Sequence, residues 1–216
     1  NEISNHIFIF EIRIAIFYLT ALQLAAKDNN YEMIYFLLSR PKTEIEPSCF
    51  KECLKLINVI IPSTVTFIGD GAFEKCTSLT QVRIPSSVTK IGNSAFEGCT
   101  SLQQMRIPGS VIKIGNSAFV DCSSMSEVLI PSSVTEIGDS AFAGCTSLKK
   151  ISIPSSVTEI GGAPLEGCTS LAQISIPSTI DFNNLGVSKS VRVDKIKTYT
   201  QSKLSFIISK LSKTIV

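Results

Sequence analysis

A sequence motif that recurs every 23 residues limits which folds this chain can adopt. The pair Ile-Pro occurs six times at this fixed step, at Ile61-Pro62, Ile84-Pro85, Ile107-Pro108, Ile130-Pro131, Ile153-Pro154 and Ile176-Pro177. Cysteine keeps the same period from Cys53 to Cys168, and phenylalanine keeps it from Phe50 to Phe142 until Leu165 takes its place. Because one such unit cannot bury its apolar side chains alone, the pattern predicts coils that stack on one another in register.

Each repeat contains two short stretches with the pattern of strands. In TQVRIP (80–85) apolar residues alternate with polar ones, which is typical of a strand with one buried side. Proline then ends the strand because it has no N–H for the ladder. The following SSVTKIG (86–92) is predicted to form a turn and a second short extended segment, with Val88 and Ile91 pointing inward.

The rest of each repeat is predicted to bring the chain back to the next strand. The segment NSAFEGC (93–99) reads as a helical or 3₁₀ turn that places Ala95 and Phe96 in the core. Gly92 and its equivalents would allow a positive φ where the coil turns. Equivalent side chains on successive coils would lie about 4.8 Å apart, so the phenylalanines would form a stack along the axis.

The pattern L-x-x-V-x-I-P-x-S-V-x-x-I-G-x-x-A-F-x-x-C-x-S-L resembles the BspA-like leucine-rich repeat family over residues 43–180. We therefore predict an α/β fold, a leucine-rich-repeat solenoid of six 23-residue coils with short parallel strands. The first and last units depart from the pattern, as terminal units of repeat arrays do. The resemblance implies a surface-antigen or adhesin-like protein that binds host matrix or other cells.

The N-terminal segment, residues 1–42, is predicted to be helical. Residues 20–40 resemble one ankyrin repeat, a pair of short helices joined by a polar turn. No membrane span is expected here, since the longest uncharged run, Ile14–Ala26, is shorter than the roughly 17–25 residues of a spanning helix. A signal peptide is not expected either, because a basic leader and a cleavage site are missing.

The C-terminal segment, residues 181–216, is basic, with seven Lys or Arg against two Asp. Its apolar residues at helical spacing predict a helix that caps the open edge of the last strand, namely Leu204, Ile207, Ile208, Leu211 and Ile215. Two alternatives are a basic amphipathic helix that lies on a membrane or a partner, and partial disorder. The whole chain carries a formal net charge of only +2, so no nucleic-acid partner is expected.

No catalytic, cofactor or metal site is expected in the repeats. The single histidine is His6, so no Cys–His or Ser–His pair can form there, and no Gly-rich phosphate loop occurs. Cysteines 23 residues apart do not have metal-ligand spacing, and Cys49 and Cys53 are not a C-x-x-C pair. Each inward thiol is instead expected to donate a weak hydrogen bond to the backbone of the adjacent coil, without a disulfide.

Outward positions on the predicted strands vary while the framework repeats, so they are candidates for partner binding. We select six of them as the candidate site, namely Gln81, Arg83, Gln104, Arg106, Glu127 and Lys150. Arg83 and Arg106 would suit the carboxylates of a protein partner. The predicted function is a non-enzymatic scaffold that binds proteins on the face lined by these strands.

Two alternatives to this function stay open. One is an intracellular ankyrin and leucine-rich-repeat adaptor, and the other is a structural repeat fragment without a ligand. The family resemblance favours the cell surface, whereas the ankyrin-like segment and the cysteine column favour the cytoplasm. The sequence leaves the location, the ligand and the oligomeric state open.

Overall fold

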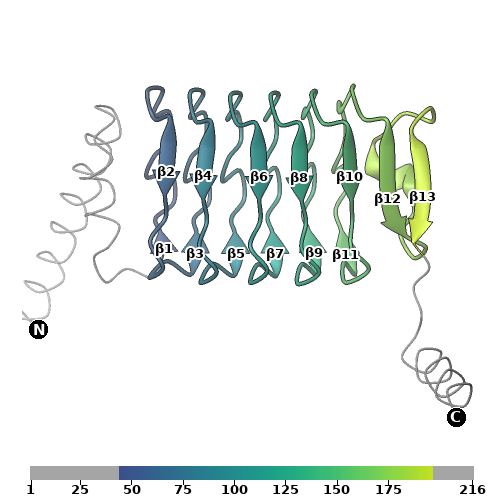
Figure 1. The fold of residues 1–216 in the computed structure, drawn as a ribbon, viewed down its shortest axis with the longest axis horizontal. Helices are drawn as coiled ribbons and strands as arrows, with labels where there is room; N and C mark the ends of the chain where they lie inside the picture. Colours follow the sequence, from purple (N-terminus) through teal and green to yellow (C-terminus); the bar gives the residue numbers. More distant parts are fainter. Residues whose placement is uncertain (1–43, 197–216) are drawn as a thin grey trace, which may run out of the picture.

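The computed structural model describes residues 44–196, and over this range the chain forms a stack of coils (Figure 1). Each 23-residue coil contributes one strand to each of two rows that run along the stack. Ring centroids in the phenylalanine column lie 4.9–5.3 Å apart between neighbouring coils. This is close to the spacing of about 4.8 Å between parallel strands, so the predicted in-register stacking is confirmed.

The two-residue strands form one continuous parallel sheet, which we call the back sheet. Its strands are β1 (Glu44–Ile45), β3 (Phe67–Ile68), β5 (Lys90–Ile91), β7 (Lys113–Ile114), β9 (Glu136–Ile137) and β11 (Glu159–Ile160). Neighbouring strands pair at an offset of one repeat, as Ile91 does with Ile68 and with Ile114. The second residue of each of these strands points into the coil, as the sequence predicts for Ile91.

The longer strands form the other row, and we call the surface made by their outward side chains the front face. They are β2 (Asn58–Ile60), β4 (Gln81–Arg83), β6 (Gln104–Arg106), β8 (Glu127–Leu129), β10 (Lys150–Ser152), β12 (Gln173–Pro177) and β13 (Arg192–Ile196). From β2 to β10 the central residue is buried and its two neighbours are exposed, which confirms the predicted alternation. Unlike the back sheet, this row is divided into three sheets, β2-β4, β6-β8 and β10-β12-β13.

The core between the two rows consists of columns of like side chains. Five buried phenylalanines stack with ring planes within 8° of parallel, namely Phe50, Phe73, Phe96, Phe119 and Phe142. Among the described residues no polar or charged side chain is buried. Each ring is covered by the rings of the coils beside it, so burial depends on stacking rather than on the single coil.

The predicted α/β class is wrong for the part of the chain that the structure describes. Its one helix is the short 3₁₀ helix η1 (Phe182–Leu185), and the chain between strands forms turns. Residues 93–99, predicted as a helical turn, include Ser94 and Gly98 at positive φ, which interrupts a helix. The N–H groups of Ser94, Phe96 and Gly98 donate to carbonyl oxygens of the next coil at 2.8 Å. Because these turns bond between coils, the described fold is a parallel β-solenoid.

The helices predicted on either side of the repeats fall outside this range. Both the ankyrin-like pair at 20–40 and the C-terminal capping helix at 204–215 lie outside the described residues. Closer to the repeats, the stack continues beyond Ile180, where the 23-residue pattern stops: η1 follows, and β13 then pairs in parallel with β12. A strand, and not a helix, therefore covers the edge of β12.

The recurring glycine of each repeat is required for a reason other than the one predicted. Gly92 and its equivalents are not among the residues with positive φ, so the expectation of a left-handed turn there is wrong. A Cβ at Gly92 would lie 2.5 Å from Oδ1 of Asp70, the atom that accepts a hydrogen bond from the N–H of Asn93. Glycine is needed because the preceding coil approaches too closely for a side chain.

The cysteine column has the role that the sequence predicts. None of the seven cysteines, all of which lie in the described range, forms a disulfide. Five thiols donate to a phenylalanine carbonyl oxygen of the preceding coil over 2.9–3.3 Å, namely those of Cys76, Cys99, Cys122, Cys145 and Cys168. Burial raises the pKa of Cys99 to about 12 and that of the half-buried Cys168 to about 11. These thiols therefore act as small core residues.

We expect a thiol reagent to modify Cys168 before Cys99 in the native protein, because the thiolate reacts and Cys99 is more buried and has the higher pKa. The rate of modification of Cys168 should still rise above pH 9.0, where the rate for a thiol of ordinary pKa levels off. Mass spectrometry after timed labelling measures the order, and protein unfolded in guanidinium is the control. Equal native rates at the two cysteines would contradict the structure.

Candidate functional site

All six candidate residues are exposed outward residues of the front strands. Two lie on β4, two on β6 and one each on β8 and β10, in the order Gln81, Arg83, Gln104, Arg106, Glu127 and Lys150. The buried residue at the centre of each strand, such as Val82, anchors it in the core. The outward side chains are thereby held in rows that follow the stack.

The row of front strands has no backbone ladder at two places. Among the described residues no backbone hydrogen bond joins β4 to β6 or β8 to β10. The back sheet continues through the same coils without interruption, and Figure 1 shows β4 and β6 farther apart than β2 and β4. The coils are therefore hydrogen-bonded at the back and separated at the front, and a groove opens at each break.

The first groove lies between β4 and β6 and has a volume of about 480 Å³. It is lined by Thr80, Gln81, Val82, Gln103, Gln104 and Arg106. Three of the six candidate residues therefore share this groove, and Arg83 is the other outward residue of the strand that carries Gln81. The lining offers amide and guanidinium donors and contains no carboxylate, which suits an acidic group.

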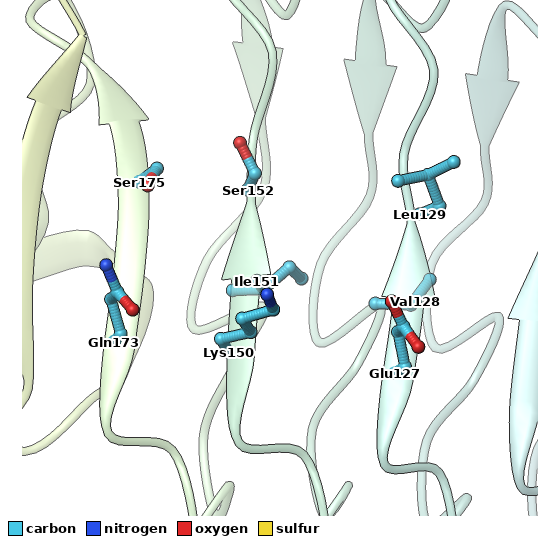
Figure 2. A pocket seen from close by; sticks show the side chains of 8 residues that line it. All are labelled: Glu127, Val128, Leu129, Lys150, Ile151, Ser152, Gln173 and Ser175. Atoms are coloured by element: carbon cyan, nitrogen blue, oxygen red, sulfur yellow. The ribbon is translucent and has the colours of Figure 1, made fainter.

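The second groove extends over β8, β10 and β12 and has a volume of about 280 Å³ (Figure 2). Its lining is Glu127, Val128, Leu129, Lys150, Ile151, Ser152, Gln173 and Ser175. Figure 2 shows Glu127 and Lys150 on facing strands, with Leu129 and Ser152 farther along them. The groove thus combines one charge of each sign with an apolar side chain that is 58% exposed, that of Leu129.

The charged side chains beside the grooves make no ion pair in the described part of the chain. Arg83 and Arg106 are exposed and have neither an ion pair nor a side-chain hydrogen bond there. Glu127 and Lys150 occupy equivalent positions on neighbouring coils, yet they form no ion pair across the break between β8 and β10. These four charges are therefore available to a partner.

The back sheet differs, because several of its charges contact side chains of adjacent strands. Lys113 of β7 forms an ion pair with Glu136 of β9. The Nζ atom of Lys90 lies 5.0 Å from the centre of the Phe67 ring, at the distance of a cation–π contact. The back sheet therefore offers less unpaired charge than the front face.

The front face ends in a group of paired polar side chains on β12 and β13. Nε2 of Gln173 donates to Asp194 at 2.5 Å, and Nε of Arg192 lies 3.2 Å from the other carboxylate oxygen. The hydrogen bond from Gln173 and the charge of Arg192 hold the pKa of Asp194 below its usual range. The charges of β13 are thus already engaged, in contrast to those from β4 to β10.

The repeat pattern that built these coils matches a known family. The family model for the BspA type leucine-rich repeat region matches residues 43–172 and 113–203, in six copies. The chain belongs to the BspA-type leucine-rich repeat family. This confirms the resemblance in the sequence, and membership supports the coarser part of the predicted function, a repeat scaffold that binds proteins.

Solved structures similar to this BspA-type chain are bacterial leucine-rich repeat proteins. One from T. pallidum is 21% identical, with 79% of this chain and 78% of that chain covered and a TM-score of 0.48. A leucine-rich cell surface protein from Faecalibacterium prausnitzii is 25% identical (76% and 65% covered, TM-score 0.37). One from Bacteroides ovatus is 21% identical, with 71% of this chain and 64% of that chain covered and a TM-score of 0.32. The chain therefore spans less than two thirds of the length of the Faecalibacterium prausnitzii and Bacteroides ovatus proteins. No curated protein matched.

Sequence reasoning missed part of the lining of both grooves. The most important residue missing from the six candidates is Leu129. The sequence could have indicated it, because Leu129 is apolar at an outward position where other coils carry Arg83 and Arg106. Thr80 and Gln103 carried no signal, because the repeat pattern is the same at bonded and unbonded strand pairs. Residues 44–196 hold no cluster of His, Cys, Asp or Glu fit for a metal ion. No helix over the same range is long and apolar enough to span a bilayer.

Proposed function

We propose that this BspA-type repeat protein is a non-enzymatic scaffold that binds protein partners through its front face. The observation that carries the proposal is the pair Arg83 and Arg106, which are exposed and unpaired in the described residues beside the groove between β4 and β6. A surface-antigen or adhesin-like role is the finer form of the proposal, and the family resemblance supports it.

The chemistry of arginine supports a carboxylate partner. A guanidinium presents its N–H groups in a planar fork that can donate two parallel hydrogen bonds to one carboxylate. Arg83 and Arg106 occupy the same outward position on successive coils, and amides from Gln81 and Gln104 lie on the same strands. Acidic side chains of a partner protein would therefore find several donors within a small area.

The contrast between the two sheets supports the choice of face. On the back sheet the ladder is continuous, and Lys113 and Lys90 are already engaged with Glu136 and Phe67. A partner would have to displace these contacts before it could bind there. On the front face the charges of β4 and β6 have no such contacts in the described residues, so binding replaces only their water.

Reversing both arginine charges should abolish most of the binding. The probes are peptides selected from a random displayed library for binding to the wild-type protein. We expect the double variant Arg83→Glu with Arg106→Glu to lower their affinity by at least about tenfold, because charge-assisted hydrogen bonds are lost and like charges are added. The matched control is Lys90→Glu with Lys189→Glu, which changes the net charge equally but lies outside the front face. Fluorescence anisotropy gives the affinities.

Two results would overturn the proposal. One is a library that yields no binder to the wild-type protein, which is the outcome expected of a structural repeat fragment without a ligand. The other is an equal loss of affinity in both double variants, which would show that general charge, and not this face, holds the peptides.

A further inference from the structure

We propose that the back sheet is an interface between two copies of this chain, which face each other with their stacks running in opposite directions. A row of four charges on this sheet, which we call the charged row, carries the proposal. It consists of the outward residues of β5, β7, β9 and β11, namely Lys90, Lys113, Glu136 and Glu159. Such a dimer does not depend on what the front face binds, and it leaves that face open on both copies.

The order of the charges makes the row complementary to itself. Two lysines are followed by two glutamates, one on each coil. Rotation by 180° about an axis that runs along the strands, between β7 and β9, reverses the row in the second copy. Lys113 then faces Glu136 of the second copy, and Lys90 faces its Glu159. Every charge of the row meets an opposite charge, whereas parallel stacks in the same register would set like charges against each other.

The regular ladder of the back sheet keeps the two rows in step. Its strands pair in register without a break from β1 to β11, and parallel strands lie about 4.8 Å apart. The step from Lys90 to Lys113 and the step from Glu136 to Glu159 are each one rung of this ladder. Because both copies use the same row, the spacing is the same on the two sides of the interface.

Within one copy the charged row contains two pairs of like charges. Lys90 is the ladder partner of Lys113, and Glu136 is the ladder partner of Glu159. Like charges at directly opposite positions of neighbouring strands repel and destabilise a sheet. In the described part of the chain the row has one ion pair, between Lys113 and Glu136, and Glu159 has none. A second copy would bring opposite charges over both like pairs and, unlike a partner without this order of charges, would leave the ion pair in place.

The residues just before these strands add an uncharged row beside the charges. They are exposed and comprise Thr89, Ile112, Thr135 and Thr158. The three threonine hydroxyls already donate to carbonyl oxygens of the preceding coil over 3.2–3.4 Å, so covering them leaves no donor unsatisfied. Ile112 is 52% exposed and would lie opposite Thr135 of the second copy. Because each back strand has only two residues, the interface is narrow, and we expect a weak, reversible dimer.

Reversing either half of the charged row in the full chain tests the dimer. Lys90→Glu with Lys113→Glu makes all four charges negative, and Glu136→Lys with Glu159→Lys makes all four positive. We expect the wild-type protein to self-associate at about 0.1 mM in low salt, and the dissociation constant to rise at least about tenfold in either double variant. An equimolar mixture of the two variants should associate at least as tightly as the wild type, because every contact then joins opposite charges. Sedimentation velocity measures all three.

The matched control is Arg83→Glu with Arg106→Glu, which changes the net charge as much as the lysine variant does but lies on the front face. It should dimerise like the wild type. An equal loss in this control would overturn the proposed dimer, as would a mixture of the two back-sheet variants that stays monomeric.

The response of the wild-type protein to salt provides a test that needs no variant. Raising the salt from about 20 mM to about 500 mM should weaken self-association at least about fivefold, because the charges at the interface are screened. A wild-type protein that stays monomeric at about 1 mM in low salt would overturn the proposed dimer, and so would an association that salt leaves unchanged.

Discussion

Replacing Phe96 by alanine should lower the free energy of unfolding by about 3–5 kcal/mol, the cost of deleting a fully buried aromatic ring. Phe96 is 0% exposed, and its ring stacks between those of Phe73 and Phe119 at 5.1 and 5.3 Å. The substitution would leave a cavity in the middle of the stack and remove contacts from two coils at once. Urea unfolding followed by circular dichroism measures the loss.

A phenylalanine on the outer side of the same solenoid provides the control. Phe67 is the outward residue of β3 and is only half-buried, with Lys90 above its ring. Phe67→Ala should cost about 1 kcal/mol or less, which is the range of an exposed cation–π contact. A loss below about 1 kcal/mol for Phe96→Ala, or the same loss at both positions, would place the column outside the core.

Gly138→Ala should also destabilise the protein strongly, by about 2 kcal/mol or more, because the new methyl group has no space. A Cβ at Gly138 would lie 2.3 Å from Oδ1 of Asn116 and 2.5 Å from its backbone nitrogen. The same Oδ1 accepts a hydrogen bond from the N–H of Asp139, so moving it aside breaks a bond between coils. The midpoint of thermal or urea unfolding reports the effect.

Gly109→Ala is the matched control for this substitution. Apart from its two chain neighbours, no residue lies within 4 Å of a Cβ added at Gly109, and the φ of Gly109 is not positive. Its replacement should leave stability unchanged or raise it by about 0.4–1 kcal/mol, since alanine restricts the unfolded chain. Similar unfolding midpoints for the two variants would show that close approach between coils is not what requires glycine at position 138.

The interior of the solenoid could be predicted almost residue by residue, because each buried column repeats every 23 residues. The stack of Phe73, Phe96 and Phe119, the inward Ile91 and the thiol of Cys99 bonded to the preceding coil all follow from that period. A buried position must meet its own copies above and below, so the identity of the copies is enough to predict the contact.

The backbone conformation of the turns that connect the strands could not be predicted in the same way. The turn that contains Ser94 resembles a helical segment in composition, but its N–H groups bond to the next coil, and only the stacked coils supply those acceptors. The α/β class was wrong for this reason. Gly92 was misread because its requirement comes from Asp70 of the preceding coil, which the local sequence does not contain.

The candidate site was predicted in part for a similar reason. The outward side chains of Arg83, Arg106, Glu127 and Lys150 followed from strand alternation, and the structure places them on one face. The grooves that separate them did not follow, because bonded and unbonded strand pairs share the same repeat. Leu129 became a candidate only once the groove beside it was visible.

By itself the sequence determined the period of the coils, the columns that fill them and the face that carries the variable charges. These three features depend on which residues recur along the chain, and the sequence alone shows that recurrence. Only the tertiary structure decided where the front ladder is interrupted, which charges find partners and how close one coil lies to the next. These depend on distances between residues of different coils, and such distances exist only after the coils have stacked.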